Sequence, residues 1–178
     1  MMDKPTIVAL FQAATAFVYL LLEVVSYNAY DLMSGILFEA EGFYGGPYGN
    51  PFRDSLSFIS LALLPLVMGA VGLVVFYGLM MEDKNAWKGS LILNLVGFLA
   101  VAMFFIPVVA EIQRQLSDPF LHFYLVRHLP SIEALFGILY YSVPLALILS
   151  FTVSICSGIV TVSDMILQGG RIRSSRPQ

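Results

Sequence analysis

The sequence predicts an all-α integral membrane protein that has four transmembrane helices and a short interfacial helix in the second outer loop. Hydrophobic residue types make up 58% of the 178 residues and charged types only 12%, about half the usual share for a soluble domain. The few charges leave long uncharged stretches, at residues 5–22, 55–81, 89–110 and 134–163. A helix needs about 20 apolar residues to cross the hydrocarbon of a bilayer. Each stretch therefore predicts one transmembrane helix.

The same composition excludes several other classes of protein. A disordered chain has low hydrophobicity and high charge, which is the opposite of this composition. Cys156 is the one cysteine of the chain, so a framework of internal disulfides is excluded. Nine basic residues against 12 acidic ones give a net charge of -3. Such a chain has no general basic field, and we expect no nucleic acid as a partner.

We interpret residues 1–178 as a single domain, a tetraspan four-helix bundle. The expected helices lie at residues 6–26, 55–81, 89–110 and 134–166, with outer loops at 27–54 and 111–133 and a basic tail at 168–178. The first helix is expected to stay in place rather than to be removed as a signal peptide, because no small-x-small cleavage site follows it.

The first outer loop, residues 27–54, is expected to be irregular around its centre. Residues 39–52 are rich in glycine, proline and aromatic residues, and glycine and proline interrupt regular structure. Such an aromatic loop packs onto its own bundle or onto a partner. The short apolar run from Leu32 to Phe38 either extends the first helix or lies in the membrane interface.

The second outer loop is expected to contain an interfacial helix at residues 119–129. Asp118 followed by Pro119 is a typical helix start. Phe120, Phe123 and Tyr124 then recur at helical spacing, which would place aromatic rings at the level of the lipid headgroups.

The distribution of basic residues predicts the orientation. With four helices, both termini and the loop at 82–88 share one side, which holds Lys4, Lys84, Lys88, Arg171, Arg173 and Arg176; the other side holds Arg53, Arg114 and Arg127. Basic residues in short loops favour the cytoplasmic side. We therefore expect both termini in the cytoplasm or its organellar equivalent, with the tail after Gly169-Gly170 acting as a helix stop and a basic anchor that touches lipid.

Two polar stripes run along otherwise apolar helices. The first comprises Gln12, Thr15, Tyr19, Glu23, Ser26 and Tyr30, and the second comprises Ala146, Ser150, Ser154, Ser157, Thr161 and Asp164. At 100° per residue, each set lies within about 60° of one line on its helix. Together with Asn94 of the third helix, these stripes give the intramembrane polar candidates Gln12, Tyr19, Glu23, Asn94 and Asp164.

These stripes have two interpretations. Small and hydroxylated residues allow helices to approach closely and to hydrogen-bond, and we favour this packing role. Alternatively, the two stripes face each other as a polar seam, with Glu23 as a proton or cation site, because ionisable groups at membrane depth are costly and often functional.

Residue types for cofactor and enzyme chemistry are scarce. Asp118 and His122 are spaced i,i+4 and could hold a metal together with His128 or Glu111, but Asp118 is more simply a helix cap and His122 an interfacial side chain. We found no pair of histidines placed to hold a haem within the bundle and no nucleotide-binding or nucleophile motif. We therefore expect no metal and no cofactor in this chain.

The function expected from these observations is that of a non-catalytic small helical subunit, or scaffold, of a larger membrane complex such as a respiratory or redox assembly. Other membrane-protein subunits and lipid are the expected partners. One alternative is a small transporter or channel, a homo-oligomer that moves protons or cations through the polar seam. A further alternative is a metal site or enzyme on the outer face.

Overall fold

A computed structural model describes residues 4–44, 55–119, 122–123, 127 and 131–174. Over these residues the chain is helical apart from short turns, and it contains no strand. The elements are α1 (Lys4–Tyr44), α2 (Ser55–Met80), α3 (Lys84–Ala100), a π-helical turn η1 (Val101–Phe105), α4 (Ile106–Leu116) and α6 (Ser131–Ser174). The prediction of an all-α protein is confirmed.

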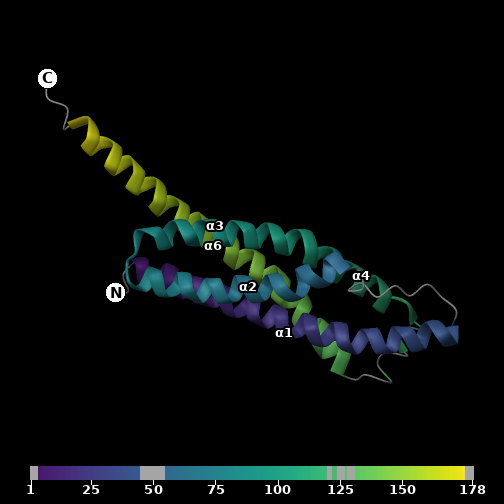
Figure 1. The fold of residues 1–178 in the computed structure, drawn as a ribbon. Helices are drawn as coiled ribbons and strands as arrows, with labels where there is room; N and C mark the ends of the chain where they lie inside the picture. The colour runs from purple at the N-terminus through teal and green to yellow at the C-terminus, as the bar shows by residue number, and fades with distance from the viewer. Residues whose placement is uncertain (1–3, 45–54, 120–121, 124–126, 128–130, 175–178) are drawn as a thin grey trace.

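The helices form a bundle in which α3, η1 and α4 follow one another as a single rod (Figure 1). Over the described residues, four segments are long and apolar enough to cross a membrane: Thr6–Asn28, Leu63–Met80, Lys84–Arg114 and Glu133–Ser163. The beginning of α1 and the end of α6 lie toward the same end of the bundle (Figure 1). The structure therefore agrees with a multi-pass membrane protein.

The first helix is longer than predicted. The chain stays helical from residue 27 to Tyr44, where the sequence analysis expects a loop from residue 27. Leucine, methionine, alanine and glutamate are good helix formers, and they are frequent between residues 29 and 41. The helix ends directly before Gly45-Gly46-Pro47, where glycine and proline disfavour its continuation. The apolar run from Leu32 to Phe38 thus extends the first helix.

A tight turn joins α2 to α3. The helix α3 begins at Lys84, before the predicted residue 89. Glu82 has a positive φ of 57°, and the Asp83 side chain accepts a hydrogen bond of 2.9 Å from the backbone N–H of Asn85. This is a regular N-cap, which satisfies one of the free amides at the helix start.

The rod widens at η1 and then continues as α4 to Leu116, past the predicted end at residue 110. Pro107 follows η1 and lacks the N–H of a regular helix, and its ring would crowd the carbonyl group of Met103. The wider turn lies at that carbonyl group, which gives a physical reason for its position.

The last helix also extends beyond its predicted limits of 134–166. It runs from Ser131 to Ser174 and passes through Gly169-Gly170, where we expected a helix stop. In Figure 1, its C-terminal end projects beyond the other helices. The predicted interfacial helix at 119–129 falls largely outside the described residues.

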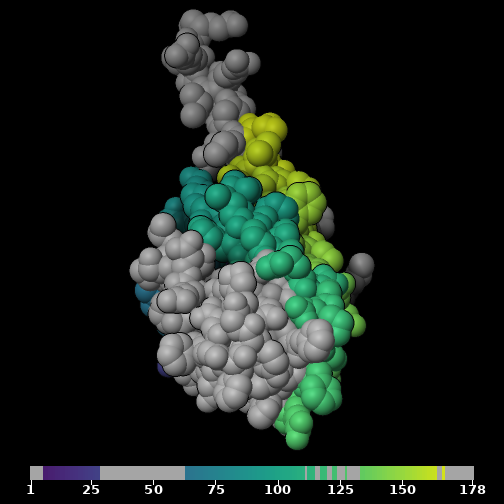
Figure 2. Space-filling view, turned by 90° about the vertical axis from the view of Figure 1, so that its right-hand side faces the viewer, coloured from purple at the N-terminus to yellow at the C-terminus, as the bar shows by residue number. Residues whose placement is uncertain are grey.

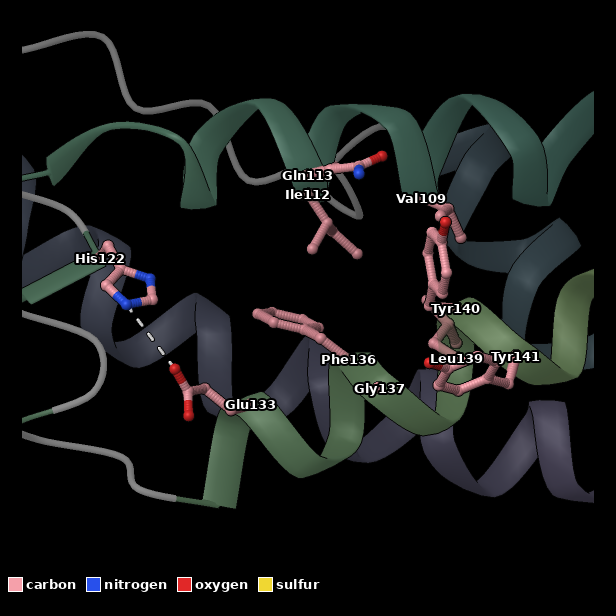
Figure 3. Close-up of a pocket in the computed structure, with 10 residues that line it drawn as sticks. All are labelled: Val109, Ile112, Gln113, His122, Glu133, Phe136, Gly137, Leu139, Tyr140 and Tyr141. Atoms are coloured by element: carbon pink, nitrogen blue, oxygen red, sulfur yellow. Dashed lines mark ion pairs between the residues drawn. The ribbon is translucent and has the colours of Figure 1, made fainter.

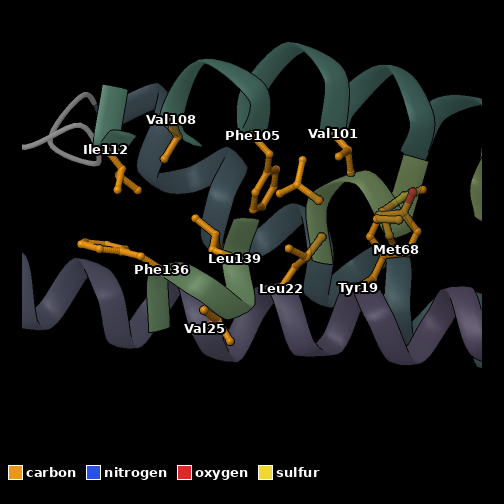
Figure 4. Packing of buried hydrophobic residues seen from close by; sticks show 12 residues of the cluster. Tyr19, Leu22, Val25, Met68, Val101, Phe105, Val108, Ile112, Phe136 and Leu139 are labelled. Atoms are coloured by element: carbon orange, nitrogen blue, oxygen red, sulfur yellow. The ribbon is translucent and has the colours of Figure 1, made fainter. Parts of the chain in front are cut away.

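The larger apolar core lies between α1, α2, the π-turn, α4 and α6 (Figure 4). Leu22, Phe105 and Leu139 are almost completely buried at its centre. A smaller cluster lies near the terminal end of the bundle and contains Val8, Ala9, Leu79, Ala86 and Val153. On the face shown in Figure 2, α3 and α6 lie side by side.

Candidate functional site: a buried polar cluster and a pocket between α4 and α6

The polar stripe of α1 faces the interior of the bundle. Gln12, Thr15, Tyr19 and Ser26 are each at most 2% exposed, and they lie within a segment that is long and apolar enough to cross a membrane. On α6, the small residues of the second stripe are also buried, from Ala146 to Thr161. Both stripes thus lie at helix interfaces, as the packing interpretation requires.

The centre of this arrangement is a set of four side chains from three helices, here called the polar cluster: Gln12, Ser90, Asn94 and Ser157. Gln12 Oε1 accepts hydrogen bonds from Ser90 Oγ at 2.8 Å and from Asn94 Nδ2 at 2.6 Å. Ser157 Oγ donates to Ser90 Oγ at 3.0 Å. Because Ser90 and Asn94 belong to α3, this helix connects the two stripes at this level.

The two stripes meet directly about two turns further along α1. Tyr19 OH and Ser150 Oγ lie 2.7 Å apart in a buried hydrogen bond between α1 and α6. Gly97 of α3 lies against the same tyrosine, and a Cβ at this position would overlap the Tyr19 hydroxyl. Glycine at this position leaves room for the Tyr19 side chain, which reaches from α1 to α3.

Four buried polar atoms have no hydrogen-bond partner among the described residues: Glu23 Oε2, Asn94 Oδ1, Ser26 Oγ and Ser154 Oγ. Unsatisfied polar groups are costly in a low-dielectric interior, and a carboxylate is the costliest of these four. Glu23 itself is partly exposed. The fifth intramembrane candidate, Asp164, lies in α6, and its side chain falls outside the described part of the chain.

A pocket of about 390 Å³ lies at the opposite end of the bundle from the termini, and we call it the α4–α6 pocket. Figure 3 shows His122 and Glu133 at one end of the pocket, Tyr140 and Tyr141 at the other, and Phe136 facing Ile112 between them. The remaining lining residues are Val109, Gln113, Gly137 and Leu139.

Of the metal candidates in the second outer loop, His122 lines this pocket. His122 Nε2 lies 3.6 Å from Glu133 Oε1, with both side chains about half exposed. The backbone N–H of His122 donates to the carbonyl oxygen of Asp118 at 2.9 Å, which is a helical contact. His128 falls outside the described residues, and those that are described contain no group of three metal-ligating side chains. Metal binding by these residues is therefore untested, and the expectation that the chain holds no metal stays a prediction.

The sequence analysis did not identify three groups that the structure makes prominent. Glu133 Oε1 lies 3.6 Å from His122 Nε2 although the two residues are well separated in the chain, and sequence spacing carries no signal for that contact. Ser90 faces the bundle one turn before Asn94, and this spacing could have revealed it. The π-turn had a local signal in Pro107.

No protein-family model, no curated protein and no solved structure matches this chain.

Proposed function

We propose that this protein is a non-catalytic helical subunit, or scaffold, of a larger membrane complex. The observation that carries the proposal is the length of α1 and α6, which have 41 and 44 residues. At 1.5 Å per residue, each helix is more than 60 Å long, roughly twice the thickness of the bilayer hydrocarbon. These two helices therefore reach well beyond the membrane.

The helices overshoot at opposite ends of the bundle. The first charged residue of α1 after Glu23 is Asp31, and the helix continues for about 20 Å from there to Tyr44. The uncharged stretch of α6 ends before Asp164, and the helix continues to Ser174, about 16 Å further. Helical projections at both ends would offer contact surfaces to neighbouring subunits on either side of the membrane.

The spanning surface of the bundle is apolar, with large side chains exposed on every spanning segment. Phe17, Val74, Met103 and Ile159 are each at least 62% exposed. Such faces suit lipid tails as well as neighbouring helices, since both are equally apolar. The projecting helix ends, rather than this apolar belt, thus distinguish a subunit from an isolated bundle.

Purification from native membranes in mild detergent, followed by native mass spectrometry, tests the proposal. We expect other subunits in a fixed ratio to the full chain. A chain truncated after Ser163 should keep its folded bundle but lose part of its partners, whereas Arg171→Gln with Arg173→Gln is the control that retains the helix and removes two charges. A protein that is purified alone or only as a homo-oligomer contradicts the proposal.

A second function, proton or cation transport in a homo-oligomer, is favoured by one observation. Glu23 Oε2 and Ser26 Oγ are buried without a partner among the described residues, and both belong to the same stripe of α1. Direct hydrogen bonds at Tyr19 and at the polar cluster occupy the seam between Glu23 and the termini, and we therefore rank this function second.

Flux measurements in reconstituted vesicles test transport. Glu23→Gln should abolish proton or cation flux, and Glu82→Gln, which alters an exposed carboxylate in the α2–α3 turn, should leave it unchanged. Absence of flux in the unmodified protein excludes this second function.

A further inference from the structure

The α4–α6 pocket has a polar end and an apolar body. Glu133 directly precedes the uncharged stretch at residues 134–163, so the His122–Glu133 pair lies at the boundary of the apolar region. From there to Tyr140 the pocket wall follows two turns of α6, about 10 Å. A ligand that matches this wall has a hydrogen-bonding head at the boundary and an apolar continuation toward the bilayer.

The lining near the polar end favours a flat ring as the head of that ligand. Phe136 is buried and contributes a ring to the wall beside His122 and Glu133 (Figure 3). Aromatic side chains bind planar rings through offset-stacked or edge-to-face contacts. The volume of about 390 Å³ is within the range of small-molecule sites.

The polar end of the pocket favours a neutral head with oxygen atoms. His122 Nε2 and Glu133 Oε1 are 3.6 Å apart, which is longer than a hydrogen bond. The imidazole can donate to a carbonyl oxygen and the carboxylate can accept from a hydroxyl group. A phosphate head would instead place its negative charge beside the Glu133 carboxylate.

We propose that the α4–α6 pocket binds a neutral, single-ring compound that carries carbonyl or hydroxyl oxygens and an apolar tail, which is the chemistry of a membrane quinone. The ring lies against Phe136, its oxygens face His122 and Glu133, and the tail leaves past Val109 and Leu139 toward the bilayer. This proposal does not depend on whether the chain has partner subunits.

Photolabelling of the full chain in phosphatidylcholine nanodiscs tests this assignment. The probe is a short-tailed azidoquinone, with decylubiquinone as the competitor and peptide mass spectrometry as the readout. We expect label within residues 133–141 that decylubiquinone displaces and that excess phosphatidylethanolamine does not. Label spread over the exposed apolar faces, or equal displacement by the phospholipid, overturns the proposal.

Two variants distinguish binding in the pocket from general binding to the protein surface. Gly137 lines the pocket, and a Cβ there would have no atom within 4 Å, so Gly137→Leu fills space without displacing the chain. His122→Ala removes a donor from a half-exposed position, where the fold tolerates the change. We expect each to weaken the affinity for decylubiquinone about tenfold.

Ile148→Trp is the matched control, because it adds bulk to the same helix at a side chain that is 64% exposed and outside the pocket. We expect this variant to bind decylubiquinone with unchanged affinity. If neither Gly137→Leu nor His122→Ala weakens binding, or if the control weakens it equally, the pocket is not the binding site.

Discussion

The two halves of the bundle are held together by different interactions. In the half near the termini, the polar cluster connects three helices through hydrogen bonds between side chains. In the other half, the buried contacts around Leu22, Phe105 and Leu139 are apolar (Figure 4). Lipid tails are as apolar as leucine, so apolar helix contacts in a membrane depend on close packing, whereas hydrogen bonds gain from the lack of water.

The two kinds of contact constrain the helices in different ways. A hydrogen bond fixes which residues of two helices are opposite one another, because its distance and angle are narrow. Apolar packing fixes the separation of the helices but tolerates exchange of similar shapes. We therefore expect the polar cluster to set the register of α1 against α3, and the apolar core to supply most of the stability.

The largest effect is expected in the apolar core. Phe105 is fully buried, and Phe105→Ala removes a ring that the surrounding helices can replace only in part. The free energy of unfolding should fall by about 3 kcal/mol, measured by titration with SDS in mixed micelles. Met103→Ala is the control in the same turn, at a side chain that is 67% exposed. Equal losses for both variants would contradict the expectation that burial of Phe105 in the apolar core causes the effect.

At the boundary between the halves, Gly97→Ala should cost about 2 kcal/mol, because the new Cβ overlaps the Tyr19 hydroxyl. Adding Tyr19→Phe removes the overlapping oxygen and should recover part of the loss. Gly89→Ala is the control, since the nearest atom to its new Cβ is Val75 Cγ2 at 3.7 Å. Strictly additive effects of the two substitutions would exclude this steric explanation.

In the polar cluster, Gln12→Leu should cost about 1–2 kcal/mol. It removes the oxygen that accepts from both Ser90 and Asn94, and these donors then lack that acceptor at the centre of the bundle. Asn28→Leu changes the same amide group at an exposed position of α1 and should be close to neutral in the same unfolding assay. A smaller loss for Gln12→Leu than for Asn28→Leu would refute the role of the cluster.

The smallest effect is expected for Ser150→Ala, about 0.6 kcal/mol, because one hydrogen bond to Tyr19 is lost. Ser154 lies one turn further along α6, and its hydroxyl has no partner among the described residues. Ser154→Ala should therefore leave the free energy of unfolding unchanged or raise it slightly. A double-mutant cycle with Tyr19→Phe should show coupling for Ser150 and none for Ser154.

Much of the architecture could be predicted from the lengths of the uncharged stretches and from the helical periodicity of the polar residues. The spans followed from the positions of charges such as Lys4, Glu23, Lys88 and Glu111, and the inward stripe of α1 followed from the spacing of its polar residues. Helix ends were harder, because α1 and α6 continue into segments whose glycines suggested interruption. A helix that has already begun can continue through glycines at a cost of about 1 kcal/mol each.

The candidate sites were predicted in part. The polar stripes and Asn94 pointed to Gln12, Tyr19 and Asn94 as intramembrane polar residues, but not to their partners. Tyr19 of the first stripe does meet Ser150 of the last one, whereas Gln12 bonds to α3. Which of three neighbours a polar side chain faces depends on the rotation of whole helices, which periodicity alone does not give. The His122–Glu133 pair depends on the course of a loop and was equally inaccessible.

The π-turn keeps the buried face of the rod formed by α3, η1 and α4 directed into the bundle in both halves. Buried positions before it include Asn94 and Gly97, and those after it include Phe105 and Ile112. From Ala86 to Ile112, about 26 residues, a regular α-helix would rotate its buried face by about 80°. One wide turn accommodates one additional residue, about 100° of rotation, and so nearly cancels this drift. Deleting Met103 would therefore turn the rod into a plain α-helix in which Ala86 and Ile112 still face the same side of the rod.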